Sequence, residues 1–183
     1  MVGIVNQKNI GALIDVKALS SFLAWTAAGA SDNVTWTGIT IDRQAFANGS
    51  MPLSMDASVV WGAKISASGS SISLAMQVQD SPDGTNWSDF ATSASTALYT
   101  AGTSGGAAFG TYRMTRSNAD NPAVTYNPNS GGLTQSPSIG LSSARRYIRI
   151  NFVPDMSGAG TDTAVMMAYG VFAGFDLLPA PIG

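Results

Sequence analysis

The sequence predicts an all-β fold, an antiparallel β-sandwich that is jelly-roll-like, with about eight strands and extended N- and C-terminal arms. Charged residues make up only 11% of the 183 residues, against about 25% in an average protein. Glutamate is absent and there are three lysines, so the charged residues that favour exposed helices are nearly missing. Short segments of alternating apolar and polar residues, separated by turn residues, favour strands throughout the chain.

The clearest strand signal lies between residues 59 and 87. Residues 71–80 alternate without a break, with Ile72, Leu74, Met76 and Val78 on one side. This pattern is typical of a strand with one buried and one solvated face. Residues 59–67 carry a matching apolar row, and the Ser-Gly-Ser connection at residues 68–70 predicts a β-hairpin. Residues 82–84 (Pro-Asp-Gly) then predict a type I turn.

Further strands are predicted at residues 34–41, 94–99, within 107–117, at 146–153 and at 163–175, with a brief pairing at 123–126. Residues 42–58 and 117–138 read as long connections, and residues 154–160 as a turn. The strand at 163–175 is apolar on both faces. It therefore needs a second sheet on one face and a subunit or an arm on the other.

The chain divides into three parts: an N-terminal arm or short helix at 1–33, a β-sandwich domain at 34–176 and a C-terminal tail at 177–183. In the first part, a helix over residues 16–25 capped by Asp15 and an extended arm over residues 1–17 are equally supported. Pro179 and Pro181 exclude a regular helix or central strand from the tail. Because the tail is also apolar, we expect it to dock against a surface.

Composition limits the possible functions. A net charge of −2 and a pI of about 4.7 do not favour nucleic-acid binding. Without cysteine or histidine, the chain has no disulfide, no thiolate zinc site and no histidine general base. The sequence has neither the pattern of a signal peptide nor an apolar run of transmembrane length. We expect a protein that is not an enzyme, has no cofactor or metal, is not bound to a membrane and is made in the cytoplasm.

Three local motifs have a possible chemical role beside a structural one. Oxygen ligands for calcium are available from Asp83, Asn86 and Asp89, or from Asp155 and Asp162. The spacing of these residues fits structural turns better than a calcium site. A pair of aspartates could also serve glycoside hydrolysis, but the aspartates lie in turns and loop edges, where a structural role is favoured. Trp87, after the Asp-Gly-Thr-Asn turn, suits either a sugar-stacking platform or a cover over the edge of the sandwich, and we favour the cover. The Gly-rich segment 102–110 lacks the Lys-Ser/Thr of a phosphate-binding loop.

Three segments carry a resemblance to a known family. They are Ser71–Trp87 with its SPDGTNW turn, Arg145–Val153 with RRYIRI, and Ala164–Pro181 with GFDLLPAP. Together, over about half of the chain, they resemble tailed-bacteriophage capsid decoration (cement) proteins of jelly-roll type, such as the podovirus cement proteins. The resemblance implies a structural virion protein on the capsid surface, made in the host cytoplasm. It would bind the major capsid protein and stabilise contacts between capsomers as a homo-oligomer, a trimer or a dimer.

The predicted partner-binding residues lie mainly in the two arms, with one in the long loop: Ile4, Ile10, Leu13, Ile14, Tyr126, Leu177, Leu178 and Ile182. Two other functions remain open on the sequence alone. One is a carbohydrate-binding β-sandwich of a phage tail or adhesin, which would use Trp87. The other is a minor head or tail completion protein with the same fold.

Overall fold

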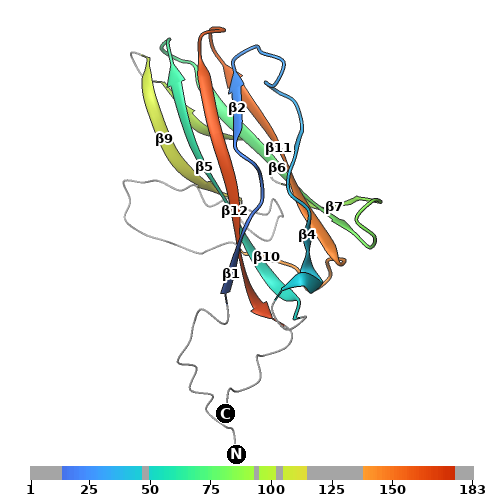
Figure 1. The fold of residues 1–183 in the computed structure, drawn as a ribbon. Helices are drawn as coiled ribbons and strands as arrows, with labels where there is room; N and C mark the ends of the chain where they lie inside the picture. The colour runs from blue at the N-terminus through green and yellow to red at the C-terminus, as the bar shows by residue number, and fades with distance from the viewer. Residues whose placement is uncertain (1–13, 47–49, 93–94, 102–104, 115–137, 176–183) are drawn as a thin grey trace, which may run out of the picture.

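The computed structural model describes residues 14–46, 50–92, 95–101, 105–114 and 138–175, which form two antiparallel sheets packed face to face (Figure 1). The predicted antiparallel β-sandwich is therefore confirmed. Sheet A contains β1 (Ile14–Ala18), β2 (Leu23–Thr26), β5 (Pro52–Ile65), β9 (Gly106–Arg113), β10 (Ile139–Gly140) and β12 (Thr163–Phe175). Sheet B contains β3 (Trp36–Thr37), β4 (Ile41–Asp42), β6 (Ser71–Ser81), β7 (Ser88–Thr92), β8 (Thr96–Thr100) and β11 (Tyr147–Ser157).

Each sheet has two long central strands, and short strands occupy its edges. In sheet A, β1 and β2 both pair with β12, which pairs with β5, and β5 pairs with both β9 and β10. In sheet B, β3 and β4 pair with β11, which pairs with β6, and β6 pairs with both β7 and β8. The chain crosses repeatedly between the sheets, and this order of strands is that of a jelly roll.

The core lies between the two sheets. The predicted row of β6 (Ile72, Leu74, Met76 and Val78) is buried, as are Ile148, Ile150 and Phe152 of β11. Met166 and Phe172 of β12 face them from sheet A. Alternation along a strand therefore identified correctly which side chains fill the sandwich.

The predicted hairpin between residues 59 and 80 is wrong, although both of its strands exist. β5 pairs with β12, β9 and β10, whereas β6 pairs with β11, β7 and β8. The two strands lie in opposite sheets, with their apolar rows facing each other across the core. The connection after β5 is held by the Ser66 N–H and hydroxyl, which donate to Asp162, and by the Gly69 N–H, which donates to the Ala101 carbonyl.

The first described residues are strands of sheet A, so the predicted helix at 16–25 is wrong. β1 and β2 add successively to the edge of β12, with Val16 opposite Val171 and Ala24 opposite Val165. The described part of the sandwich therefore includes β1 and β2, which precede the predicted boundary at residue 34. Residues 1–13 lie outside the described part of the chain.

The predicted strand at 34–41 is divided into β3 and β4 around Gly38. The Gly38 N–H donates to the Ile150 carbonyl and the next N–H, of Ile39, donates to the Leu19 carbonyl. A Cβ at Gly38 would lie 2.6 Å from the Leu19 oxygen and closer still to the Ile150 oxygen. The chain at Gly38 is therefore held against two backbone carbonyls, where a side chain does not fit.

Two prolines that we expected to mark connections lie inside strands. β5 begins at Pro52, within the predicted connection at 42–58, because a first strand residue does not need its N–H for the ladder. β11 continues through Pro154, within the predicted turn at 154–160. The Pro154 carbonyl points away from β6 and accepts the Asn33 N–H at 2.8 Å. In an antiparallel pair the nitrogen and the carbonyl of a residue point to the same side, so the proline nitrogen also faces away from β6 and no hydrogen bond to β6 is lost.

The strands predicted at 94–99 and within 107–117 correspond to β8 and β9, while β7 and β10 were not predicted. The 3-10 helix η2 (Arg43–Ala45) follows β4 and is capped by Asp42. The predicted pairing at 123–126 and the tail at 177–183 lie outside the described residues. Among those that are described, no helix is long and apolar enough to cross a membrane.

Candidate interaction surface

The outer face of sheet A carries most of the exposed large apolar side chains in the described part of the chain. Six of the ten such residues lie on four strands of this sheet and point away from the core. We call this surface the apolar face and define it by Ile14, Val16, Val60, Phe109, Val165 and Met167. Isolated exposed apolar residues are common, but a continuous set on one sheet is typical of an interaction site.

The register of the strands brings these side chains together. Met167 of β12 lies opposite Val60 of β5, and Val165 lies opposite Gly62, which in turn lies opposite Phe109 of β9. Directly opposed residues of antiparallel strands have Cβ atoms about 4.5–5.5 Å apart and point to the same side. The apolar face is therefore continuous across the central strands of sheet A, and Val16 extends it along β1 through its partner Val171.

The charges on the apolar face largely neutralise each other. The Arg113 guanidinium of β9 forms an ion pair with Asp56 of β5, and its Nε donates to Asp56 Oδ1 at 3.0 Å. Lys64 lies toward the end of β5, opposite Thr163 and Ala107. Asp15 and Lys17 of β1 alternate with the apolar residues of that strand, point to its other side and pair with each other at 2.9 Å.

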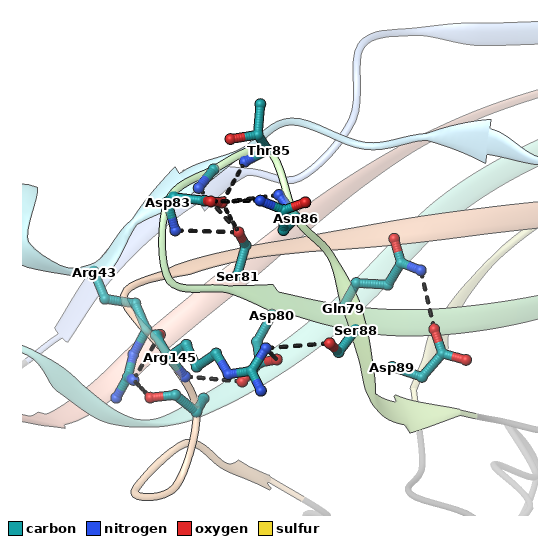
Figure 2. Close-up of polar contacts among 12 residues, drawn as sticks. Arg43, Gln79, Asp80, Ser81, Asp83, Thr85, Asn86, Ser88, Asp89 and Arg145 are labelled. Atoms are coloured by element: carbon teal, nitrogen blue, oxygen red, sulfur yellow. Dashed lines mark hydrogen bonds and ion pairs between the residues drawn. The ribbon is translucent and has the colours of Figure 1, made fainter.

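The outer face of sheet B is polar. Gln79 of β6 is its centre, since its Oε1 accepts from Arg149 Nε and Nη2 at 3.0 and 2.8 Å and from Asn151 Nδ2 at 3.0 Å. Its Nε2 donates to Asp89 Oδ1 at 3.0 Å. Figure 2 shows this end of sheet B, where the Arg145 backbone N–H also bonds to Asp80 and its guanidinium to Ser88. The two outer faces of the sandwich therefore differ in chemistry.

Trp87 lies against the outer face of sheet B, where an arginine covers one face of its ring. The Arg149 guanidinium lies over its ring, 4.1 Å from the centroid, and the indole is half-buried. Burial lowers the pKa of Arg149 from its usual value. A sugar would have to displace this arginine from the ring face that it covers, so the geometry favours the structural role of Trp87.

The turn after β6 uses its polar groups internally. Ser81 Oγ accepts from the Gly84 N–H at 2.9 Å, and Asp83 Oδ1 accepts from the N–H groups of Thr85 and Asn86 at 2.9 and 2.8 Å (Figure 2). Gly84 has φ of +77°, as expected for a glycine that ends this turn. These hydrogen bonds, first of all that from the Asn86 backbone, hold the pKa of Asp83 far below its usual value.

The aspartates considered as metal ligands do not converge. Asp162, in the second predicted pair, is buried and accepts from Ser66, which lowers its pKa. Within the described ranges, no group of three or more His, Cys, Asp or Glu side chains is placed to hold a metal ion. The aspartates in these segments therefore organise turns and connections.

Of the predicted partner-binding residues, Ile14 lies on the apolar face, where it is 42% exposed. The other seven lie outside the described residues: Ile4, Ile10, Leu13, Tyr126, Leu177, Leu178 and Ile182. Val16, Val60, Phe109, Val165 and Met167 were not among the predicted site residues. A signal was present in the sequence for Val165 and Met167, because β12 has apolar residues on both faces.

Comparisons with known proteins leave the family of this chain undefined. No family model matches it, and no curated protein matches it. Chains of infectious bursal disease virus are among the solved structures with some similarity. They include the Gx strain structure (TM-score 0.40, 10% identity, 89% of this chain and 32% of that chain). They also include the VP2 subviral particle (TM-score 0.41, 12% identity, 91% of this chain and 34% of that chain).

The chain spans about a third of the length of these matched viral chains. Its identity to them is too low for any of their properties to be transferred to it, because one fold serves many unrelated functions. The function must therefore be argued from the surfaces of this chain.

Proposed function

We propose that this chain is a structural virion protein, specifically a capsid decoration (cement) protein. It binds the outer surface of a phage head, has the major capsid protein as its partner, and stabilises contacts between capsomers as a homo-oligomer. The observation that carries this proposal is a sandwich with a continuous apolar outer face, which suits a protein partner better than a small-molecule substrate. The sequence resemblance over 71–87, 145–153 and 164–181 supports the same function.

The distribution of polar groups also favours a structural role over an enzymatic one. Histidine and cysteine are absent from the chain. The aspartates of the SPDGTNW turn and of the connection before β12 accept hydrogen bonds from neighbouring backbone and serine groups. Groups used in this way hold the scaffold together and are not placed to activate a substrate.

Both arms would act from one end of the sandwich. Ile14 of β1 lies opposite Ala173 of β12, so the chain enters sheet A beside the point where it leaves that sheet (Figure 1). The predicted capsid-binding residues Ile4, Ile10 and Leu13 precede Ile14, and Leu177, Leu178 and Ile182 follow β12. Two attachment segments joined to one rigid body raise each other's effective concentration, so that weak individual contacts add into firm retention.

The test uses heads of the encoding virus prepared without this protein. The full-length chain should co-sediment with the heads to saturation and appear as symmetric external density in electron micrographs. A variant that lacks residues 1–13 should fold normally and bind at least about tenfold more weakly, because it loses one of two linked attachments. Trp87→Ala serves as the matched control and should bind like the wild type.

Two results would replace this function with one of its rivals. A few copies per virion at a single vertex would identify a head or tail completion protein. Specific binding on a glycan array that is lost in Trp87→Ala, without binding to heads, would identify a carbohydrate-binding module.

A further inference from the structure

We infer that the apolar face is the surface through which this chain pairs with a second copy of itself, sheet A against sheet A, about a two-fold axis. The inference gives the proposed homo-oligomer a defined interface. It rests on the geometry of sheet A and would hold for a protein with any of the functions considered above.

The first argument is exposure. Phe109 is 89% exposed, and Val16, Val60 and Met167 are 58%, 46% and 46% exposed, on strands that are bonded in one sheet. A phenylalanine this exposed on a strand makes almost no contact with the rest of the described chain. Its burial against another surface would recover most of the hydrophobic free energy of the ring.

The second argument is charge. In a two-fold interface the same surface meets itself, so an unpaired charge near the axis would face its own copy and repel it. The Asp56–Arg113 ion pair is neutral as a unit, and Lys64 lies toward the end of β5 where an interface has its rim. With Lys64 at the rim, the apolar face has little charge near its centre to repel a second copy, and it offers few groups to a strongly charged partner.

The third argument is area. β12 has 13 residues, and sheet A has four strand positions across. At about 3.3 Å per residue and about 4.8 Å between strands, the face measures about 43 by 19 Å, or about 800 Å². This is about the area that each partner contributes to a stable interface of standard size.

The fourth argument is shape. Gly62 lies opposite Phe109 in register, yet the nearest neighbours of a Cβ at Gly62 would be Val165 Cγ2 at 3.8 Å and the Ala108 carbonyl at 3.9 Å. The Phe109 ring therefore does not cover Gly62, and the face has a projection and a bare site one strand apart. With a two-fold axis through the centre of the sheet, Phe109 of each copy would be buried against the sheet of the other.

The test is sedimentation equilibrium of the full-length chain without capsids, so that its failure is distinct from failure of head binding. The wild type should dimerise at micromolar concentration. Phe109→Ser should weaken dimerisation by about 100-fold, because each substitution acts twice in a two-fold interface. Val60→Thr, in the middle of the face, should weaken it by at least about fivefold. Val34→Thr is the matched control, because Val34 is also 46% exposed but lies outside sheet A, and it should have no effect.

A second measurement does not depend on destabilising the interface. The chain has no cysteine, so Val60→Cys and Val34→Cys each provide one labelling site. An environment-sensitive dye should become shielded with rising protein concentration at position 60 and not at position 34. A wild type that stays monomeric overturns the inference. Dimerisation that resists both Phe109→Ser and Val60→Thr overturns it too. Dimerisation that resists Val60→Thr alone would indicate pairing along the β9 edge and would also overturn it.

Discussion

Arg43 is the buried residue with the largest polar head in the described part of the molecule, and it joins three segments. Its Nη2 donates to the carbonyls of Pro52 and Leu141, both at 2.8 Å, and its Nη1 donates to those of Ala144 and Arg145. The guanidinium thereby fixes the start of β5 to the loop that leads into β11. A fork of several donors on a rigid plane is suited to such a task.

We predict that Arg43→Met lowers the free energy of unfolding by about 3 to 5 kcal/mol, because it leaves buried carbonyls without donors. Urea denaturation monitored by tryptophan fluorescence measures this change. Arg146→Met is the control: Arg146 is exposed and pairs with Asp42 at 2.7 Å, so its loss should be much smaller. Equal losses for the two variants would contradict the bridging role of Arg43.

Asp83 should make the stability of the SPDGTNW turn depend on pH. Its folded-state pKa is lowered by the hydrogen bonds of the turn, so the stabilisation is present above the unfolded pKa and is lost as the pH falls below about 4. The melting temperature of the wild type should therefore exceed that of Asp83→Asn at about pH 7. The difference between the two temperatures should become smaller toward about pH 2. Asp155→Asn is the control, because it makes the same change of net charge at an exposed position of sheet B. A difference in melting temperature of the same size for this variant would contradict a cause within the turn.

At the scale of elements, the sequence predicted well which residues form strands and less well which strands are neighbours. The alternation of residues 71–80 identified the buried row of β6 because side-chain direction is a local property. The same alternation cannot distinguish two strands paired side by side from two strands that face each other across a core. β5 and β6 were therefore assigned to a hairpin, while the contacts that separate them come from β11 and β12, far along the chain.

For a related reason, β10 was missed and β3 and β4 were predicted as a single strand. β3, β4 and β10 have two residues each, too few for a periodic signal. The apolar face was predictable only in part: the two-sided apolar pattern of β12 indicated a covered outer face, but Val60 and Phe109 join it through register alone. Interaction residues that come from four strands are visible only when the strand order is known.

Gly38 tests how firmly β3 and β4 are positioned. Gly38→Ala should destabilise the fold by about 2 to 4 kcal/mol, because the added methyl group meets the backbone carbonyls of Ile150 and Leu19. Gly106→Ala is the matched control, since a Cβ there has no neighbour within 4 Å. Thermal and urea unfolding should show a change within about 0.5 kcal/mol for this control. A similar tolerance at Gly38 would mean that the segment between β3 and β4 is held more loosely than the contacts indicate.

At the scale of the whole molecule, the sandwich has one polar outer face and one apolar outer face, and its two described ends lie together. Sheet B bonds many of its surface groups to each other, which leaves fewer of them to bond to a partner. Sheet A leaves much of its surface apolar, with Asp56 and Arg113 paired. The arms are thus free for the proposed attachment to a capsid, while sheet A holds two copies together, and a dimer would double the number of attachments.

If sheet A pairs with itself, stability must depend on protein concentration, because a partner that binds only the folded chain stabilises it by mass action. The wild-type melting temperature should rise by about 2 °C for each tenfold increase in concentration once the dimer predominates. Phe109→Ser should melt at a temperature that does not change with concentration, since the side chain is 89% exposed and its loss leaves the core intact. Differential scanning calorimetry over two decades of concentration, with Val34→Thr as control, measures both slopes. A wild-type slope of zero would show that the apolar face remains uncovered in solution.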